Sequence, residues 1–207
     1  SLSGIRDISV IETAPVSRIP TKVQVSEYSS ELVEQAIHNE IDRDGQVLIV
    51  YNKVESIYEY SNIIRNMFPN ISVDVAHGQM EQTQLEKAIF KLYNNETQIL
   101  ISTTLIENGI DLPNANTLIV VNADMLGLSQ LYQLKGRVGR ADKQAYAYFT
   151  YDPHRILTDT ALKRLESITE YSSMGSGFKI AMRDLSIRGA GDILGSEQAG
   201  FIDTVGI

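Results

Sequence analysis

Two arginines three positions apart, Arg137 and Arg140, are the residues of this sequence best suited to chemistry. Each follows a glycine, and a short amphipathic stretch containing Gln133 leads into them. Residues three apart share one face of a helix, so on a helix the two guanidinium groups would project to the same side. The glycines allow the backbone to approach a ligand closely. Two permanently charged, forked groups on one face are suited to a polyphosphate, and a solvated basic helix end is the plain alternative.

The pattern Q-x-x-G-R-x-G-R over residues 133–140 resembles the last signature motif of superfamily 2 helicases and translocases. The resemblance implies that the two arginines complete an ATP site as catalytic fingers, that Gln133 is a third catalytic residue, and that Gly136 binds the nucleotide. Lys135 stands where that superfamily usually has arginine, a departure that leaves both predicted fingers in place.

A second segment, ISTTLIENGIDLP at residues 101–113, lies between two apolar runs and predicts a strand, a polar turn and a second buried strand. It resembles the T-T-x-x-x-x-G-I-D-x-P motif of the same enzymes. The resemblance implies nucleic-acid backbone contacts for Thr103 and Thr104, and nucleotide contacts for Gly109 and Asp111. Ordinary turn hydroxyls and a turn-forming aspartate are the alternatives.

Longer stretches resemble one family of this superfamily, the bacterial transcription–repair coupling factors. Ser1–Asp7 and Val10–Pro15 are similar to the segment that joins the two motor lobes in that family. AHGQM at Ala76–Met80 resembles its counterpart of a nucleic-acid contact motif, which implies DNA contacts for His77 and Gly78. For His77, a residue that merely ends a strand is the alternative.

Residues 187–200 carry IRGAGDILG followed by EQAG, which resembles the translocation motif that this family shares with the branch-migration helicase of recombination. The resemblance implies that Arg188, Gly189 and Gln198 couple ATP use to movement along DNA. A helix-end charge is the alternative for Arg188, and an ordinary surface position is the alternative for Gln198. The likeness covers essentially the whole chain, and its opening residues favour the coupling factors over the recombination relative.

No G-x-x-x-x-G-K-[ST] phosphate loop and no Asp-Glu pair suited to magnesium occurs in the sequence. We therefore expect the second lobe of a two-lobed motor, with ATP and Mg²⁺ bound mainly by an absent first lobe, and no ATP hydrolysis by this chain alone. The resemblance implies a translocase on double-stranded DNA that displaces stalled RNA polymerase and engages a damage-recognition protein of excision repair. A fork-remodelling helicase and a non-catalytic nucleotide- or protein-binding module are the alternatives.

The composition is that of an ordinary globular domain without disulfides. Of the 207 residues, 43% are hydrophobic and 21% are charged, and the lack of cysteine excludes thiolate zinc sites. No apolar run approaches the ~20 residues that cross a membrane, and three scattered histidines predict no metal cluster. The lack of cysteine fits a cytoplasmic location, and we expect no membrane partner; the resemblance implies a bacterial protein.

The net charge of −8, from 18 basic and 26 acidic residues, opposes tight DNA binding by this chain alone, because such binding neutralises phosphates. The negative charge is compatible with DNA binding if one narrow edge of the domain faces DNA while acidic helices face water. Four acidic residues around a predicted helix are expected to face water: Glu27, Glu31, Glu34 and Glu40.

Short apolar runs alternate with helical patterns, which predicts an α/β fold with a mostly parallel sheet and helices on both faces. The resemblance makes this sheet RecA-like. The expected strands are Val47–Val50, Val73–Ala76, Ile99–Ile101, Leu118–Val121 and Ala145–Phe149, and the expected helices cover about 30–43, 54–67, 80–94 and 129–136. Such sheets bind ligands beyond the carboxyl ends of their strands, where we expect Asn52, His77, Thr103 and the turn before Asp111. We expect Asn52 to be one of the residues that bind DNA.

After about residue 153 the pattern changes. Helical stripes around Leu157–Ile168 and Phe178–Leu185, separated by the glycine-rich Gly175–Gly177, predict a helical hairpin followed by a glycine-containing loop. We expect three parts: an inter-lobe connecting segment at 1–20, a second RecA-like lobe at 21–153, and the hairpin with the translocation-motif loop at 154–207.

Overall fold

The computed structural model describes residues 19–104 and 111–169, which form a six-stranded sheet with every neighbouring pair of strands parallel. The strand order is β1-β6-β5-β2-β4-β3. The strands are β1 (Lys22–Glu27), β2 (Gln46–Val50), β3 (Val73–Ala76), β4 (Ile99–Ser102), β5 (Ala115–Val120) and β6 (Tyr146–Tyr151). The helices are α2 (Ser30–Asp42), α3 (Ile57–Met67), α4 (Gln82–Tyr93), α5 (Leu128–Arg137) and α6 (Asp159–Thr169), with short 3-10 turns η1 (Val54–Ser56) and η3 (Ala123–Met125).

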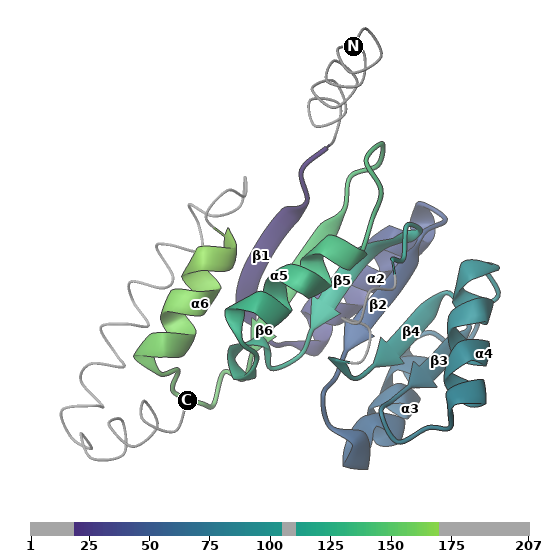
Figure 1. The fold of residues 1–207 in the computed structure, drawn as a ribbon, viewed down its shortest axis with the longest axis horizontal. Helices are drawn as coiled ribbons and strands as arrows, with labels where there is room; N and C mark the ends of the chain where they lie inside the picture. Colours follow the sequence, from purple (N-terminus) through teal and green to yellow (C-terminus); the bar gives the residue numbers. More distant parts are fainter. Residues whose placement is uncertain (1–18, 105–110, 170–207) are drawn as a thin grey trace, which may run out of the picture.

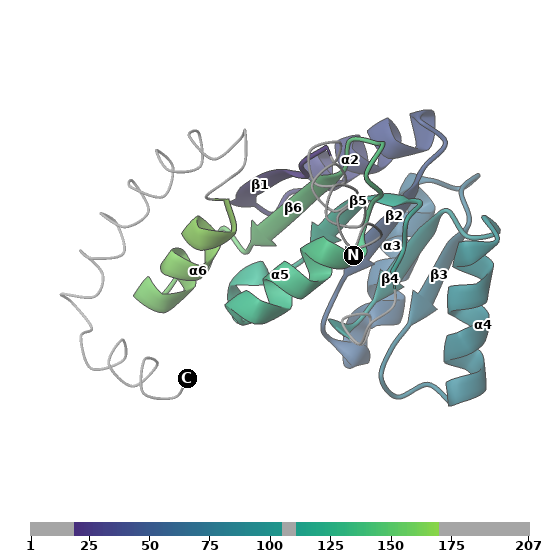
Figure 2. The same cartoon turned by 45° about the horizontal axis from the view of Figure 1, so that its top comes forward.

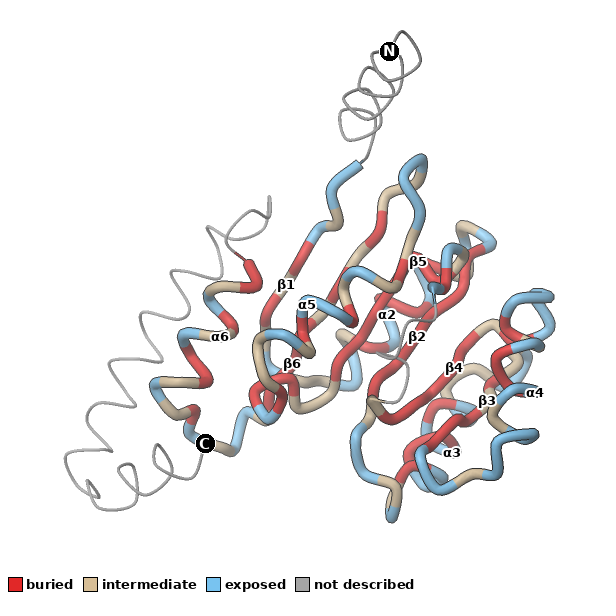
Figure 3. The backbone as a smooth tube through the Cα atoms, in the orientation of Figure 1, coloured by how far each residue is buried: buried red, intermediate tan, exposed pale blue. Residues whose placement is uncertain are grey.

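Helices cover both faces of the sheet (Figures 1 and 2). The core between the sheet and α4, α5 and α6 contains Leu48 and Val50, whereas Val47 and Ile49 belong to the core beneath α2 and α3. Successive side chains of a strand point to opposite faces, so a parallel strand covered on both sides is a continuous apolar run. Figure 3 shows the buried strands between helices whose outer sides are exposed. The predicted α/β architecture is confirmed.

The five expected strands and four expected helices are present within a few residues of their expected bounds. The strand β1 was not predicted. It lies at the sheet edge beside β6, and only Val23 and Val25 of its six residues are buried. Lysine, glutamine and serine alternate with these valines, and the resulting short, half-polar segment lacks the continuous apolar run of the central strands.

The end of α2 contains a buried ion pair that corrects one expectation. Glu31 and Glu34 are exposed as predicted, but Glu40 is buried, and its carboxylate pairs with the guanidinium of Arg43 at 2.6 Å. Thr117 of β5 donates its hydroxyl to the same carboxylate. A Cβ on Gly45 would come within 2.0 Å of Oε2 of Glu40, so glycine is required where the chain turns into β2.

The helix α6 confirms the first of the two helical stripes predicted after residue 153. Leu157, Leu165 and Ile168 are buried in the core that α4 and α5 share, and the hydroxyl of Tyr132 in α5 donates to the carbonyl oxygen of Ser167 in α6 at 3.0 Å. The second stripe and the loop with Arg188, Gly189 and Gln198, like the opening segment, lie outside the described residues. The three-part division of the chain therefore stays a prediction.

Candidate functional site at the two edges of the sheet

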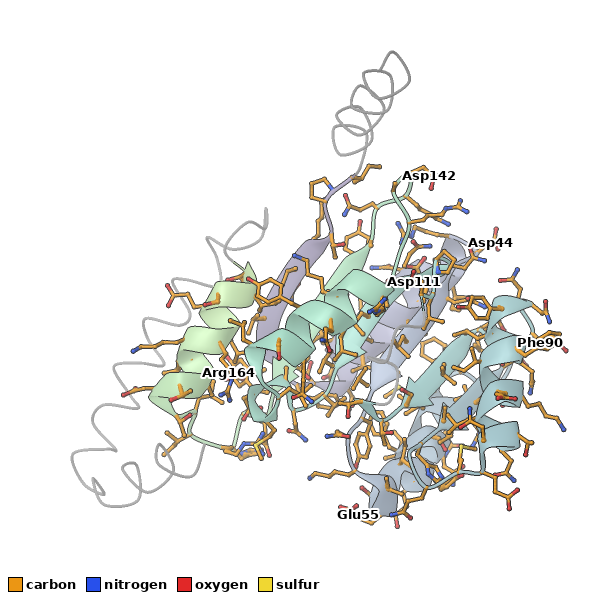
Figure 4. All side chains as sticks on the ribbon, in the orientation of Figure 1. Asp44, Glu55, Phe90, Asp111, Asp142 and Arg164 are labelled. Carbon is orange, nitrogen blue, oxygen red and sulfur yellow. The ribbon has the colours of Figure 1, made fainter. Side chains whose placement is uncertain are left out.

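The predicted site residues divide between the two edges of the sheet. In an all-parallel sheet the carboxyl ends of all strands meet at one edge and the amino ends at the other. Asn52, His77 and Thr103 follow the carboxyl ends of β2, β3 and β4 as expected. Asp111 and Arg137 lie at the amino edge instead. In Figure 4, Asp111 and Asp142 lie toward the upper ends of the strands, and Glu55 of η1 lies at the opposite end.

Asp111 itself lies at the amino edge, whereas the carboxyl edge was expected for the turn before it. The chain must return from the carboxyl end of β4 to the amino end of β5, because the two strands run in the same direction. Asp111 comes four residues before Ala115, the first residue of β5, and so has already reached the amino edge. The turn before it, with Gly109, lies outside the described residues.

Backbone hydrogen bonds join the two predicted nucleotide motifs at this edge. The N–H of Leu112 donates to the carbonyl oxygen of Arg137 at 2.7 Å, and the N–H of Gly139 donates to the carbonyl oxygen of Ala115 at 2.9 Å. Leu112 and Val138 form a parallel bridge. These bonds place Asp111 next to the end of α5, so two motifs far apart in sequence form one surface.

The two arginines do not share a helix face, contrary to the helical arrangement considered for them. Arg137 is the last residue of α5, and Arg140 lies in the loop that follows. Gly139 between them has a φ of +81°, a conformation that strains other residues, and a Cβ there would come within 2.9 Å of the Cβ of Ala145. Tertiary packing therefore ends the helix one residue after Gly136.

Each arginine pairs with its own exposed carboxylate. An Nη1 atom of Arg137 lies 3.3 Å from Oδ1 of Asp111, and Nε of Arg140 lies 2.8 Å from Oδ1 of Asp142. Both carboxylates are more than 70% exposed. The cationic groups are thus held at the surface by anions that a competing phosphate can replace.

The surface beside the arginines is open. Gln133 and Gly136 are both exposed, and a Cβ added to Gly136 would meet no atom of the described chain within 4 Å. Within the part of the chain that the structure describes, neither packing nor backbone conformation accounts for a glycine there. Lys135 is half-buried and its ammonium lies 6.0 Å from the ring centroid of Tyr132; burial lowers the pKa of Lys135 below its usual value.

The carboxyl edge has a different chemistry. His77 and Thr103 are only 8% and 5% exposed, and so are nearly covered. Thr104 donates its hydroxyl to Oδ1 of the exposed Asn52 at 3.3 Å. Gly78 is exposed, and a Cβ there would likewise meet no atom within 4 Å. The structure thus brings the described DNA-binding candidates to one edge, and the exposed ones among them, Asn52 and Gly78, carry no charge.

Two residues of these edges were missed by the sequence analysis. Asp142 follows Arg140 by two positions, a spacing that could have suggested an ion pair. Tyr58 of α3 is 52% exposed, and its hydroxyl lies 3.0 Å from Nε2 of His77. No sequence signal connects Tyr58 to His77, because the contact depends on how α3 packs beside β3.

Comparison with known proteins assigns the chain to a family. Residues 28–142 match the helicase conserved C-terminal domain. The chain belongs to this family. Over 206 residues it is 53% identical to the transcription-repair-coupling factor of Staphylococcus aureus (strain NCTC 8325 / PS 47) and 52% identical to that of Staphylococcus haemolyticus (strain JCSC1435). These matches cover 100% of this chain and 18% of each relative, so the chain spans about a fifth of their length.

Solved structures support the RecA-like fold. RecG bound to a three-way DNA junction is 29% identical, with a TM-score of 0.60 over 83% of this chain and 23% of that one. The second domain of the DEAD-box helicase Mss116p, bound to an RNA duplex, has a TM-score of 0.58 over 74% of this chain and 61% of that one. At 18% identity, the second likeness concerns the fold alone.

No described helix combines the length and the apolar character that crossing a bilayer requires. Within residues 19–104 and 111–169, no three His, Asp or Glu side chains are grouped so that they could hold a metal ion.

Proposed function

We propose that this chain is the second motor lobe of an ATP-dependent translocase on double-stranded DNA, of the transcription-repair-coupling kind. The observation that carries the proposal is the amino edge, where backbone hydrogen bonds join two separate motifs and present Arg137, Arg140 and Asp111 together. The 53% identity to transcription-repair-coupling factors over the whole chain supports the same assignment.

The amino edge fits the phosphate end of ATP. Two guanidinium groups lie at the surface beside the open Gly136, and each is balanced by a carboxylate that phosphate oxygens can replace. Guanidinium forks match phosphate geometry, so Arg137 and Arg140 neutralise the charge that develops during transfer, while Asp111 and Gly109 lie against the nucleotide. The phosphate loop and the main Mg²⁺ ligands belong to a first lobe outside this chain, because the sequence contains no phosphate-loop motif.

The carboxyl edge serves the DNA backbone. Asn52, His77, Gly78, Thr103 and Thr104 lie there, away from the arginines. Contacts from such neutral groups to phosphates position the duplex without selecting a sequence. Placing the ATP and DNA contacts at opposite edges of one rigid sheet lets closure of the two lobes move the DNA edge relative to the first lobe.

Arg188, Gly189 and Gln198 then couple closure to a step along DNA. In the whole protein that movement displaces a stalled RNA polymerase and brings in the damage-recognition protein of excision repair, in the bacterial cytoplasm. A fork-remodelling helicase is the second candidate, since 83% of this chain resembles part of RecG. The lower identity of 29%, against 53% to the coupling factors, favours the first.

The proposal is tested with the full-length protein that contains this segment. We expect ATP hydrolysis, displacement of a third strand from triplex DNA, and release of a stalled polymerase from a linear template. Arg188→Ala or Gln198→Ala should leave hydrolysis largely intact and abolish both kinds of displacement, because hydrolysis needs only lobe closure. Equal losses of hydrolysis and displacement would contradict the coupling role, and activity confined to forks would favour the second candidate.

A further inference from the structure

A chain of hydrogen bonds leads from the backbone to the surface at the carboxyl edge. The backbone N–H of Gln79 donates to Nδ1 of His77 at 3.2 Å, so this nitrogen is an acceptor. A neutral imidazole that accepts at Nδ1 carries its proton on Nε2. Because Nε2 lies 3.0 Å from the hydroxyl oxygen of Tyr58, His77 donates to that oxygen.

This arrangement leaves the hydroxyl proton of Tyr58 for an outside acceptor. A phenol both donates and accepts, and His77 occupies its accepting side. Among the described residues the hydroxyl has no second hydrogen-bond partner. Tyr58 is 52% exposed and His77 is 8% exposed, so the tyrosine is the outermost donor of the pair. The two rings meet edge to face at 5.5 Å, which fixes the direction of the hydroxyl.

Asn52 has the same arrangement on a separate element. The Thr104 hydroxyl donates to its Oδ1 atom from within the chain, which leaves the amide NH₂ group to donate outward. In both exposed groups an inner residue donates to the acceptor atom, and the remaining donor has no hydrogen-bond partner among the described residues. Gly78, which directly follows His77, leaves open space at the same edge. Exposed groups that can still donate a hydrogen bond, but whose acceptor atoms are already used, suit an anion such as a backbone phosphate.

We propose that Tyr58 makes a direct hydrogen bond to a DNA-backbone phosphate, and that His77 acts behind it as a positioning residue. The inference rests on the proposed function and changes the role assigned there to His77. A neutral hydroxyl contributes affinity without releasing a counterion, because it does not neutralise a phosphate. A chain with a net charge of −8 can hold DNA in this way without a strongly basic surface.

The test is Tyr58→Phe in the full-length protein, with duplex binding measured over a series of salt concentrations in the presence of a non-hydrolysable ATP analogue. Deleting the hydroxyl keeps the ring, so the fold is preserved. We expect affinity to fall on the order of 10-fold, as for loss of a hydrogen bond to a charged group, with no change in the slope of log K against log salt. Lys53→Gln, at an exposed lysine of the same edge, should instead make that slope shallower.

Tyr132→Phe is the matched control, because Tyr132 is also an exposed tyrosine (43%) whose hydroxyl bonds within the chain, but to α6. It should leave DNA affinity unchanged. The positioning role is tested by a double-mutant cycle. His77→Phe should weaken binding in the wild type and have little further effect in Tyr58→Phe, because both act through one hydroxyl.

The outcomes separate this inference from the proposed function. If the wild type moves along duplex DNA and Tyr58→Phe binds as tightly as Tyr132→Phe, the phosphate contact is wrong and the motor assignment stands. Additive losses from the Tyr58 and His77 variants would overturn the positioning role. A wild-type protein that neither binds nor moves on duplex DNA would instead contradict the proposed function.

Discussion

The two edges of the sheet present opposite kinds of polar group. The amino edge presents guanidinium groups balanced by exposed carboxylates, and the carboxyl edge presents hydroxyl and amide donors that inner residues orient. Charge that develops during phosphoryl transfer calls for full positive charges, which act most strongly in the transition state. A duplex that must dissociate and bind again at each step is better held by neutral hydrogen bonds, which are weaker than contacts from charged groups. In the proposed motor, the full charges among the predicted site residues lie at the ATP edge, and the neutral donors lie at the DNA edge.

The largest effect is expected from substitutions of the two arginines at the amino edge. In the full-length protein, Arg137→Ala or Arg140→Ala should lower kcat for ATP hydrolysis by roughly 10³–10⁵ with a modest change in ATP affinity, because a finger acts mainly in the transition state. Steady-state hydrolysis and nucleotide-binding titrations measure the two quantities. Arg137→Lys should recover little, since lysine keeps the charge and loses the fork. Normal hydrolysis by both alanine variants would make the arginines structural.

A second comparison sets the buried ion pair at the amino edge against the exposed ones. Arg43→Met removes the cation that neutralises the fully buried carboxylate of Glu40, which should destabilise this lobe by about 3–5 kcal/mol. Calorimetric unfolding of the full-length protein should show the transition of this lobe at a lower temperature. Asp142→Asn is the control, because an exposed pair contributes at most about 1 kcal/mol. Equal shifts from the two variants would contradict the distinction between a structural and a displaceable pair.

A smaller effect is expected at the carboxyl edge. Thr104→Val removes the hydroxyl that orients Asn52 while keeping the shape of the side chain, so duplex affinity should fall about 3-fold, a loss near 0.6 kcal/mol typical of one indirect hydrogen bond. DNA titration and ATP hydrolysis on the same preparation check it. Basal hydrolysis without DNA should not change, and its loss would show that the two edges are not chemically separate.

The smallest effect is expected on ATP affinity, from a change to the carboxylate that pairs with Arg140 at the amino edge. Asp142 holds Arg140 in the absence of nucleotide, and Asp142→Asn should release that arginine and tighten ATP binding about 2-fold, in line with the strength of a surface ion pair. The apparent affinity should depend more strongly on salt than in the wild type, because the variant makes the site more positive and removes a competing ion pair that salt also weakens. Weaker ATP binding by this variant would mean that Asp142 orients Arg140 for the phosphate and does not compete with it.

Much of the fold could be predicted from local pattern, and its exceptions have physical causes. The apolar runs of β2 and β5 indicated buried parallel strands because both of their faces are covered by helices. β1 escaped prediction because an edge strand that alternates polar residues with two valines lacks that signature. Arg43, three residues after Glu40, is a partner that local spacing could have suggested, but no local signal shows that Thr117 of β5 will cover the pair.

For the candidate site, the sequence by itself determined which residue types exist and how they are spaced: two glycine-preceded arginines, a Thr-Thr to Gly-Ile-Asp segment and an Ala-His-Gly motif. Only the tertiary structure decided where they lie. It returned Asp111 to the amino edge, ended α5 at Arg137, and set Tyr58 in front of His77. Periodicity is a property of neighbouring residues, whereas these placements depend on parallel strand direction and on packing between elements distant in the chain.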